Sequence, residues 1–228
     1  MVTQASTTQT GTPSSAQSKH DPLAAIRPDM NQLNEVIRQT LHSEVPLVNQ
    51  ISEYLISAGG KRLRPAIHLL LTRALQNACP HSAYTLAAVV EFIHTSTLLH
   101  DDVVDESDLR RGRQTANAMF GNAASVLVGD FLYSRSFQMM VSVQSMRVME
   151  ILADATNVIA EGEVLQLLNV HDPDVTEARY MQVIHYKTAR LFEASTQLAA
   201  VMSGCTPEQE EACAAYGRHL GAAFQLAD

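Results

Sequence analysis

The fold is decided by the stretch SAYTLAAVVEFIHTSTLLHDDVVD, residues 82–105, which is apolar over most of its length and acidic at its end. Its apolar residues fall on most sides of a helix rather than on one stripe, so this helix is expected to be largely buried. Such a helix requires neighbouring helices that cover it. The stretch therefore predicts a helical bundle.

The flanking sequence is also helical in pattern. Ala58-Gly59-Gly60 is expected to end one helix, and Pro65 suits the first turn of the next, at 65–78. Strands are not expected, because the Val-rich stretches are short and do not alternate with polar residues. A polar turn from Glu106 to Thr115 follows the long helix. Further helices are expected at 116–121, 122–143, 146–168, 176–203 and 207–227, which makes the chain all-α.

The first twenty residues differ from the rest. Twelve of residues 1–20 are Thr, Ser or Gln, and apolar side chains are scarce. Such a segment cannot offset its ordering entropy by burial, so it is expected to be a disordered N-terminal tail. Residues 21–228 are expected to form one domain.

Composition limits the classes of function. Apolar residues make up 46% and charged residues 18%, as in a globular protein. The net charge of −8 gives no bulk attraction to nucleic acid, and no apolar run approaches the ~18 residues needed for a transmembrane segment. Cys79, Cys205 and Cys213 form no CxxC pair, which is typical of a reducing, cytoplasmic location.

An acidic cluster ends the long helix. Asp101 and Asp105 are one turn apart on the same face, about 6 Å along the axis. Two carboxylates so placed repel each other unless a cation lies between them, and the helix dipole also disfavours negative charge there. Two hard oxygen ligands with room for water and phosphate are typical of a Mg²⁺ site.

Basic residues accompany the acids. Arg110 and Arg111 follow directly and can hold phosphate oxygens through two hydrogen bonds each. Lys61 and Arg64 lie in a glycine-containing turn that is typical either of a phosphate cradle or of a solvated basic loop. Lys187 interrupts an apolar helix and either contacts phosphate or extends to the surface. The acids with the adjacent arginines indicate chemistry on a diphosphate.

Together these segments resemble the trans-isoprenyl diphosphate synthases, or polyprenyl synthetases, and especially their octaprenyl-forming members. The resemblance covers about residues 21–228, and its motifs occur in the family's order. The matching segments are GGKRLRP at 59–65, EFIHTSTLLHDDVVDESDLRRGRQTAN at 91–117, GNAASVLVGDFLYSRSFQMM at 121–140, EGEVLQL at 161–167, YKTARLFEAS at 186–195 and FQLAD at 224–228.

The resemblance implies an isoprenoid-synthase-type helical bundle around a central active-site cavity. It implies that isopentenyl diphosphate is joined to an allylic diphosphate, and that the protein is a homodimer. Mg²⁺ on the allylic diphosphate would be held by Asp101 and Asp105, with Asp102 assisting. The implied catalytic residues are Asp101, Asp105 and Lys187.

Two further sets of residues are implied to contact the substrates. The residues expected to bind isopentenyl diphosphate are Lys61, Arg64, His94 and Arg111. The residues expected to contact the allylic substrate around its leaving group are Arg110, Lys187, Thr188 and Gln225.

The implied product is long. In the family, a bulky aromatic residue five positions before the first aspartate stops chain growth early, and this sequence has Ser96 there, followed by Thr97. The expected product is therefore an octaprenyl chain, a precursor of quinone side chains. The alternative interpretation is that small residues at this position only permit close helix packing.

The end of the sequence departs from the family. A second aspartate-rich motif is expected directly after FQLA, but the sequence stops at Asp228. We therefore expect a bundle that lacks its C-terminal helices, and 228 residues that are poorly active alone.

Three other functions are compatible with part of the sequence. A non-catalytic partner subunit of a full-length synthase would account for the missing motif, although it need not keep Asp101 and Arg110. A terpene cyclase would share the first acidic motif but would not need GGKRLRP. A metal phosphohydrolase, suggested by His100-Asp101, would require further histidines in helical register.

Overall fold

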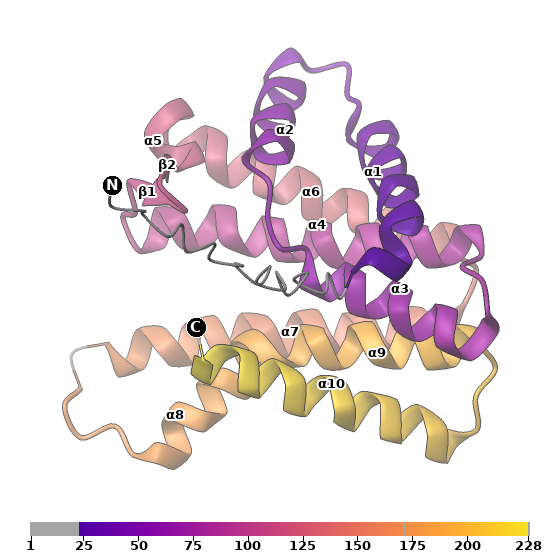
Figure 1. The fold of residues 1–228 in the computed structure, drawn as a ribbon. Coiled ribbons are helices and arrows are strands. Elements are labelled where there is room, and N and C mark those ends of the chain that lie inside the picture. Colours follow the sequence, from indigo (N-terminus) through magenta and orange to yellow (C-terminus); the bar gives the residue numbers. More distant parts are fainter. Residues whose placement is uncertain (1–22, 171, 228) are drawn as a thin grey trace, which may run out of the picture.

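The structure is a computed structural model that describes residues 23–170 and 172–227. The expected tail at 1–20 lies outside the described residues. The described chain is a bundle of helices, in which α4 and α6 lie above α7, α9 and α10 (Figure 1). The prediction of an all-α fold is confirmed.

The elements follow one another with short connections. The first part contains a 3-10 helix Ala24–Ile26, α1 Arg27–Leu41, α2 Pro46–Ala58, α3 Leu63–Gln76 and α4 His81–Val104. The middle part contains β1 Leu109–Arg110, β2 Arg113–Gln114, α5 Ala116–Phe120, α6 Asn122–Ser142 and α7 Met146–Asn169. The last part contains α8 Glu177–Val183, a π-helical segment Ile184–Ala189, α9 Arg190–Met202 and α10 Pro207–Ala227.

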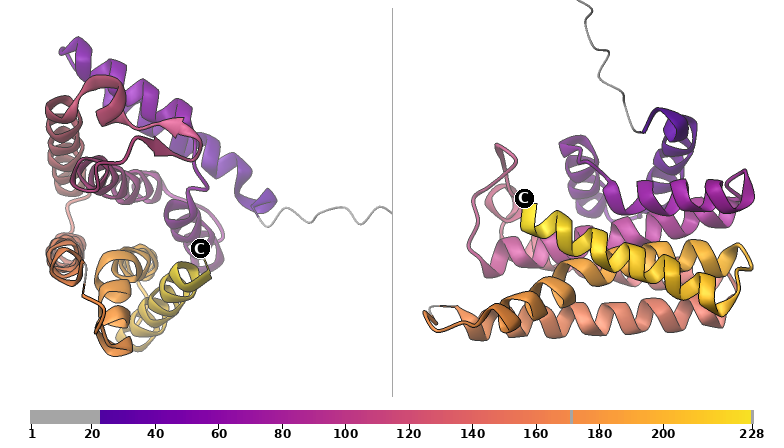
Figure 2. Two further views of the ribbon diagram at one scale, coloured as in Figure 1. Left: turned by 90° about the vertical axis from the view of Figure 1, so that its left-hand side faces the viewer. Right: turned by 60° about the horizontal axis from the view of Figure 1, so that its bottom comes forward.

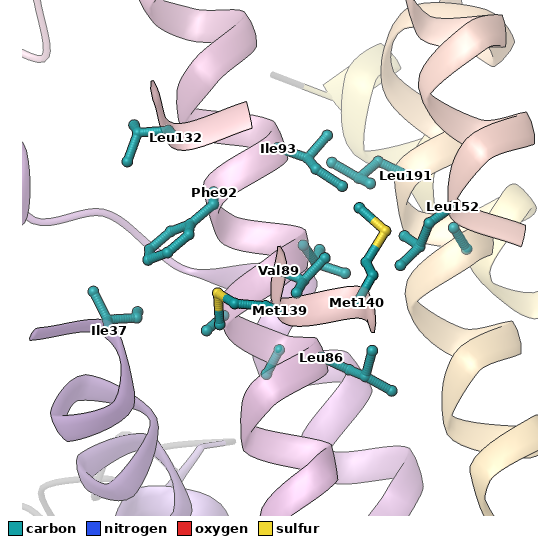
Figure 3. Close-up of a cluster of buried hydrophobic side chains, with 14 of the residues drawn as sticks. Ile37, Leu86, Val89, Phe92, Ile93, Leu132, Met139, Met140, Leu152 and Leu191 are labelled. Carbon is teal, nitrogen blue, oxygen red and sulfur yellow. The ribbon is translucent and has the colours of Figure 1, made fainter. Parts of the chain in front are cut away.

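Helix α4 lies at the centre of the core, as its sequence predicted. It packs against α1, α3, α6 and α9, and its side chains are buried around the whole circumference. Phe92 points toward Ile37, whereas Ile93 points toward Leu191 on the other side of the helix (Figure 3). Burial on every side fixes the position of α4, and with it the acidic residues at its C-terminal end.

The polar turn after α4 contains a small hairpin that the sequence did not predict. Leu109 pairs with Gln114 and Arg110 with Arg113 in an antiparallel ladder. Arg111 and Gly112 between them have positive φ values of 53° and 75°, as in a type I′ turn. Two-residue strands are too short for an alternating pattern, so they left no periodic signal in the sequence.

The helix expected at 176–203 is divided by the π-helical segment into α8 and α9. Glycines let this region pack closely on its neighbours. A Cβ added at Gly162 of α7 would lie 2.9 Å from the Lys187 amide nitrogen, and one added at Gly221 of α10 would lie 2.6 Å from the Ala189 Cα. The backbone of the π segment therefore contacts both α7 and α10.

Helix α10 reaches back to the turn that precedes α3. At its C-terminal end the ring of Phe224 lies 5.7 Å from the Lys61 ammonium. Figure 2 shows the course of α10 along the bundle from two further directions. Residues far apart in sequence thereby share one end of the bundle. Within the described residues, no helix combines the length and hydropathy needed to cross a membrane.

Replacing Gly217 by Ala is expected to destabilise the protein by about 1–3 kcal/mol. The added Cβ would lie 2.5 Å from the Phe192 carbonyl oxygen and 2.9 Å from the Glu193 Cα, and these backbone atoms cannot move aside. Gly129→Ala is the matched control, because its closest neighbour is the end of the His100 side chain, which can rotate. Urea unfolding of both variants measures the difference. Equal stability of the two would contradict the close packing of α10 on α9.

Candidate active site

A cavity of about 800 Å³ opens at the end of the bundle where the predicted motifs meet. The end of α4, the turn before α3, the hairpin, the π segment and the end of α10 contribute its polar wall. Its apolar wall comes from α1, α2, α4 and α6. The apolar lining residues include Ile37, Leu41, Leu55, Phe92 and Leu132. A charged mouth that continues into an apolar interior suits a ligand with an anionic head and a hydrocarbon tail.

Asp101 and Asp105 both line the cavity. The Asp101 carboxylate is mostly buried and lies 3.2 Å from the Lys187 ammonium, whereas Asp105 is exposed at the end of α4. Across residues 23–170 and 172–227, no three His, Cys, Asp or Glu side chains form a metal site by themselves. Two carboxylates facing an open cavity nevertheless fit Mg²⁺, which keeps several waters and takes substrate phosphate oxygens as ligands.

Asp102 points to a different partner. Its buried carboxylate accepts hydrogen bonds from Arg110 Nε at 2.9 Å and Arg110 Nη2 at 2.7 Å. The backbone carbonyl of Asp102 also accepts a hydrogen bond from the Asn117 amide. Asp102 therefore fastens the hairpin to α4, and Arg110 already uses two donors on it. The metal-binding role expected for Asp102 and the phosphate-binding role expected for Arg110 stay predictions.

Two basic segments distant in sequence come together on one part of the cavity lining, called the basic wall below. Arg111 Nη1 donates to the Gly59 carbonyl oxygen at 2.9 Å, and it lies where a side chain on Gly60 would project. Gly59 has φ 66°, so the turn itself requires glycine. Lys61 and Arg64 line the same cavity.

One hydrogen-bond donor of Arg64 is left without an acceptor by the described residues. Its guanidinium lies 4.5 Å from the Phe192 ring, and its Nε is buried without a hydrogen-bond acceptor among the described residues. Burial lowers the pKa of Arg64 to about 10, although Glu91 opposes the shift. A cation held in this state favours the arrival of an anion.

His94 and Glu91 lie beneath this basic wall. Burial lowers the pKa of His94 well below its ordinary value, and Arg64, Arg111 and Arg110 lower it further, so the imidazole is neutral. Burial raises the pKa of Glu91, while its neighbouring arginines oppose the rise. The Glu91 carboxylate lies 3.8 Å from Arg62 Nε. Sequence analysis did not assign Glu91, although its position three residues before His94 places both on one helix face.

Lys187 lies between two carboxylates. Its ammonium is 2.6 Å from Glu163 of α7 and 3.2 Å from Asp101 of α4. Burial lowers the pKa of Lys187, but the two carboxylates outweigh burial and the net shift is upward. Thr188 donates a hydrogen bond to the Gln225 side-chain oxygen at 2.9 Å. Glu163 was not assigned from the sequence, although it lies within the EGEVLQL motif.

Ser96 and Thr97 are neighbours in sequence but lie in different environments. The Ser96 hydroxyl is buried and donates to the Gly129 carbonyl oxygen of α6 at 2.9 Å, so this residue lies at the contact between α4 and α6. Thr97 lies on the cavity wall. Of the two residues expected to control product length, only Thr97 is among the residues that line the cavity. Ser96 fits the alternative interpretation, that a small residue permits close helix packing.

The chain is similar to known prenyl synthases. A family model described as polyprenyl synthetase matches residues 45–228. The octaprenyl diphosphate synthase of Escherichia coli (strain K12) is 60% identical over 88% of this chain. An all-trans-nonaprenyl-diphosphate synthase of Rhodobacter capsulatus is 46% identical over 92% of it. The chain spans 62% and 64% of the lengths of these two relatives.

Solved structures agree in fold. A decaprenyl diphosphate synthase from Rhodobacter capsulatus superposes with a TM-score of 0.86 at 51% identity, covering 89% of this chain and 63% of that one. A polyprenyl synthase from Caulobacter crescentus CB15, complexed with calcium and isoprenyl diphosphate, gives a TM-score of 0.85 at 49% identity, covering 90% and 62%. The motifs, the cavity and these similarities lead to one conclusion: the chain belongs to the polyprenyl synthetase family.

Proposed function

We propose that the chain forms most of the catalytic domain of a trans-polyprenyl diphosphate synthase, an enzyme that joins isopentenyl diphosphate to a growing allylic diphosphate. One observation carries the proposal: Asp101 and Asp105 line the same cavity as Lys61 and Arg64, and apolar side chains line the rest of it. Two diphosphates require two groups of charge, and a growing hydrocarbon requires the apolar wall. The octaprenyl and nonaprenyl diphosphate synthases among the relatives support the same reaction.

In the proposed reaction, the allylic C–O bond breaks and its electron pair leaves with the diphosphate. The double bond of isopentenyl diphosphate attacks the allylic carbon, and a proton is lost to the released diphosphate. Mg²⁺ held by Asp101 and Asp105 would stabilise the charge on the leaving diphosphate. Lys187 lies beside Asp101 and is positively charged, so it can bind the same diphosphate oxygens.

The second diphosphate is proposed to bind at the basic wall. Arg64 has a buried donor that finds no acceptor in the described part of the chain, and a diphosphate oxygen would supply one. The neutral His94 imidazole can donate a single hydrogen bond without adding charge. The wall thereby favours isopentenyl diphosphate, while the acids with their metal favour the allylic substrate.

The remaining expectations are proposals as well. The E. coli relative, an octaprenyl diphosphate synthase, supports an octaprenyl product. The use of this product as a quinone side-chain precursor and a cytoplasmic location are proposed from the sequence alone. Helix α6 exposes Leu127 and Val141 at 67% and 63%, which supports a homodimer. Helix α4, in contrast, is covered by α1, α3, α6 and α9. The intact acidic and basic groups favour an enzyme over a non-catalytic subunit.

Replacing Asp101 by Ala in the intact enzyme is expected to reduce prenyl transfer by about 10²–10³-fold or more, by analogy with the loss of one group that stabilises developing charge. Asp154→Ala is the control, because Asp154 is an exposed carboxylate on α7 outside the cavity. Radiolabelled isopentenyl diphosphate incorporation measures both. An Asp101→Ala variant within tenfold of the wild type would refute the assignment.

Replacing Lys61 or Arg64 by Ala in the intact enzyme is expected to raise the KM for isopentenyl diphosphate more than the KM for the allylic primer. Both residues belong to the basic wall, which comes from a different segment of the chain than Asp101. Arg73→Ala, on the same helix as Arg64 but paired with Asp29 in another part of the bundle, is the control. Steady-state kinetics with each substrate varied in turn gives the two constants. The reverse order would show that the two diphosphate sites are exchanged.

Replacing Thr97 by Phe is expected to shorten the products, because the ring would narrow the cavity one turn before Asp101. Ser96→Phe should instead destabilise the protein by about 1–3 kcal/mol, since the ring would enter the packed contact with α6. Chromatography of the extracted products and thermal unfolding separate the two effects. Unchanged products from Thr97→Phe would mean that the chain does not pass this residue.

A further inference from the structure

Three elements meet at the Lys187 ammonium. Lys187 belongs to the π segment, Asp101 to the last turn of α4, and Glu163 to α7. The exposed fractions of the three side chains are 22%, 14% and 28%. Charges that are this strongly shielded from solvent interact more strongly than an exposed surface pair.

The backbone fixes this arrangement. Gly162, next to Glu163, packs against the π segment so closely that an added Cβ would lie 2.8 Å from Tyr186 Cβ and 2.9 Å from the Lys187 nitrogen. Asp101 is held by a helix that is buried on every side. Lys187 can therefore pair with either of two carboxylates, and packing fixes the positions of both.

An ammonium 3.2 Å from Asp101 opposes the binding of a divalent cation to the same carboxylate. It neutralises the charge that attracts the metal, and it repels a second cation directly. Asp105, one turn further on, has no such partner among the described residues. The shorter distance of 2.6 Å to Glu163 provides a place where the ammonium stays paired after it moves away from Asp101.

We propose that Lys187 and a divalent cation compete for Asp101, and that Glu163 is a positioning residue that holds the ammonium when the metal binds. The proposal rests on the proposed function, since it requires a metal at Asp101 and Asp105. It assigns Glu163 a role in metal affinity although this residue is not a metal ligand. It also predicts that Lys187→Met and Glu163→Gln change the metal affinity in opposite directions.

Lys187→Met should bind Mn²⁺ more tightly, because the competitor is gone, and Glu163→Gln should bind it more weakly, because Lys187 keeps Asp101 as its single counter-charge. Each change is expected to be about three- to tenfold, as for one partly buried charge pair. Electron paramagnetic resonance of free Mn²⁺, with and without excess inorganic diphosphate, measures the affinity. Glu161→Gln is the matched control, since Glu161 is an exposed residue of the same helix that pairs with Asn157.

The double variant separates positioning from a direct effect of the Glu163 charge on the metal. If Glu163 acts through Lys187, Glu163→Gln has no further effect in the Lys187→Met background. Equal weakening in both backgrounds would overturn the proposal, as would Lys187→Met binding Mn²⁺ no more tightly than the wild type. Lys187→Gln replaces Lys187→Met if thermal unfolding shows that the latter does not fold.

Asp105→Asn distinguishes this inference from the proposed function, because Asp105 belongs to the metal site but not to the lysine pair. If Asp105→Asn leaves Mn²⁺ binding unchanged, or if the wild type binds no Mn²⁺ in either condition, the metal site itself is refuted and the inference with it. If Asp105→Asn weakens binding but the Lys187 and Glu163 variants do not change it, only the competition is refuted.

Discussion

Burial of α4 on every side is the constraint on which the rest of the structure depends. A helix covered by α1, α3, α6 and α9 cannot rotate or slide without opening the core, so its last turn has a fixed place. That turn carries Asp101 and Asp105, which would otherwise be unfavourable at the negative end of a helix. The packing energy of the apolar core therefore holds an acidic group where electrostatics alone would not place it.

Some charged groups around the cavity are fully paired with one another, and others are only partly paired. Asp102 and Arg110 neutralise each other and join the hairpin to α4, whereas no described residue accepts a hydrogen bond from the buried Nε of Arg64. Lys187 is shared between Glu163 and Asp101. Paired groups give the wall its shape, and the incompletely paired ones are those available to an anion. The same wall can thus be rigid and still bind diphosphate.

The periodic features of the sequence predicted most of the fold, because burial leaves a repeating apolar pattern. The long helix, the turn at Gly59 and the helices that follow Thr115 are examples. Three features left no such pattern: the two-residue strands, the π segment, and the roles of Glu91 and Glu163, whose meaning depends on which cation faces them. The rotation of α4 in the bundle decides whether Ser96 faces the cavity or a neighbouring helix. Ser96 and its neighbours are all small and polar, so the sequence does not show which of them faces the cavity.

The π-helical segment changes the direction in which the side chains that follow it point around the helix axis. One residue more per turn shifts every side chain after Ala189 by about 100° relative to a continuous α-helix. Lys187 and Thr188, which contact Glu163 and Gln225, lie within this segment, between the phase of α8 and that of α9. The length of this segment is therefore as constrained as its residues: a one-residue deletion would restore a regular helix and turn either the cavity wall or the buried face of α9 away from its partners.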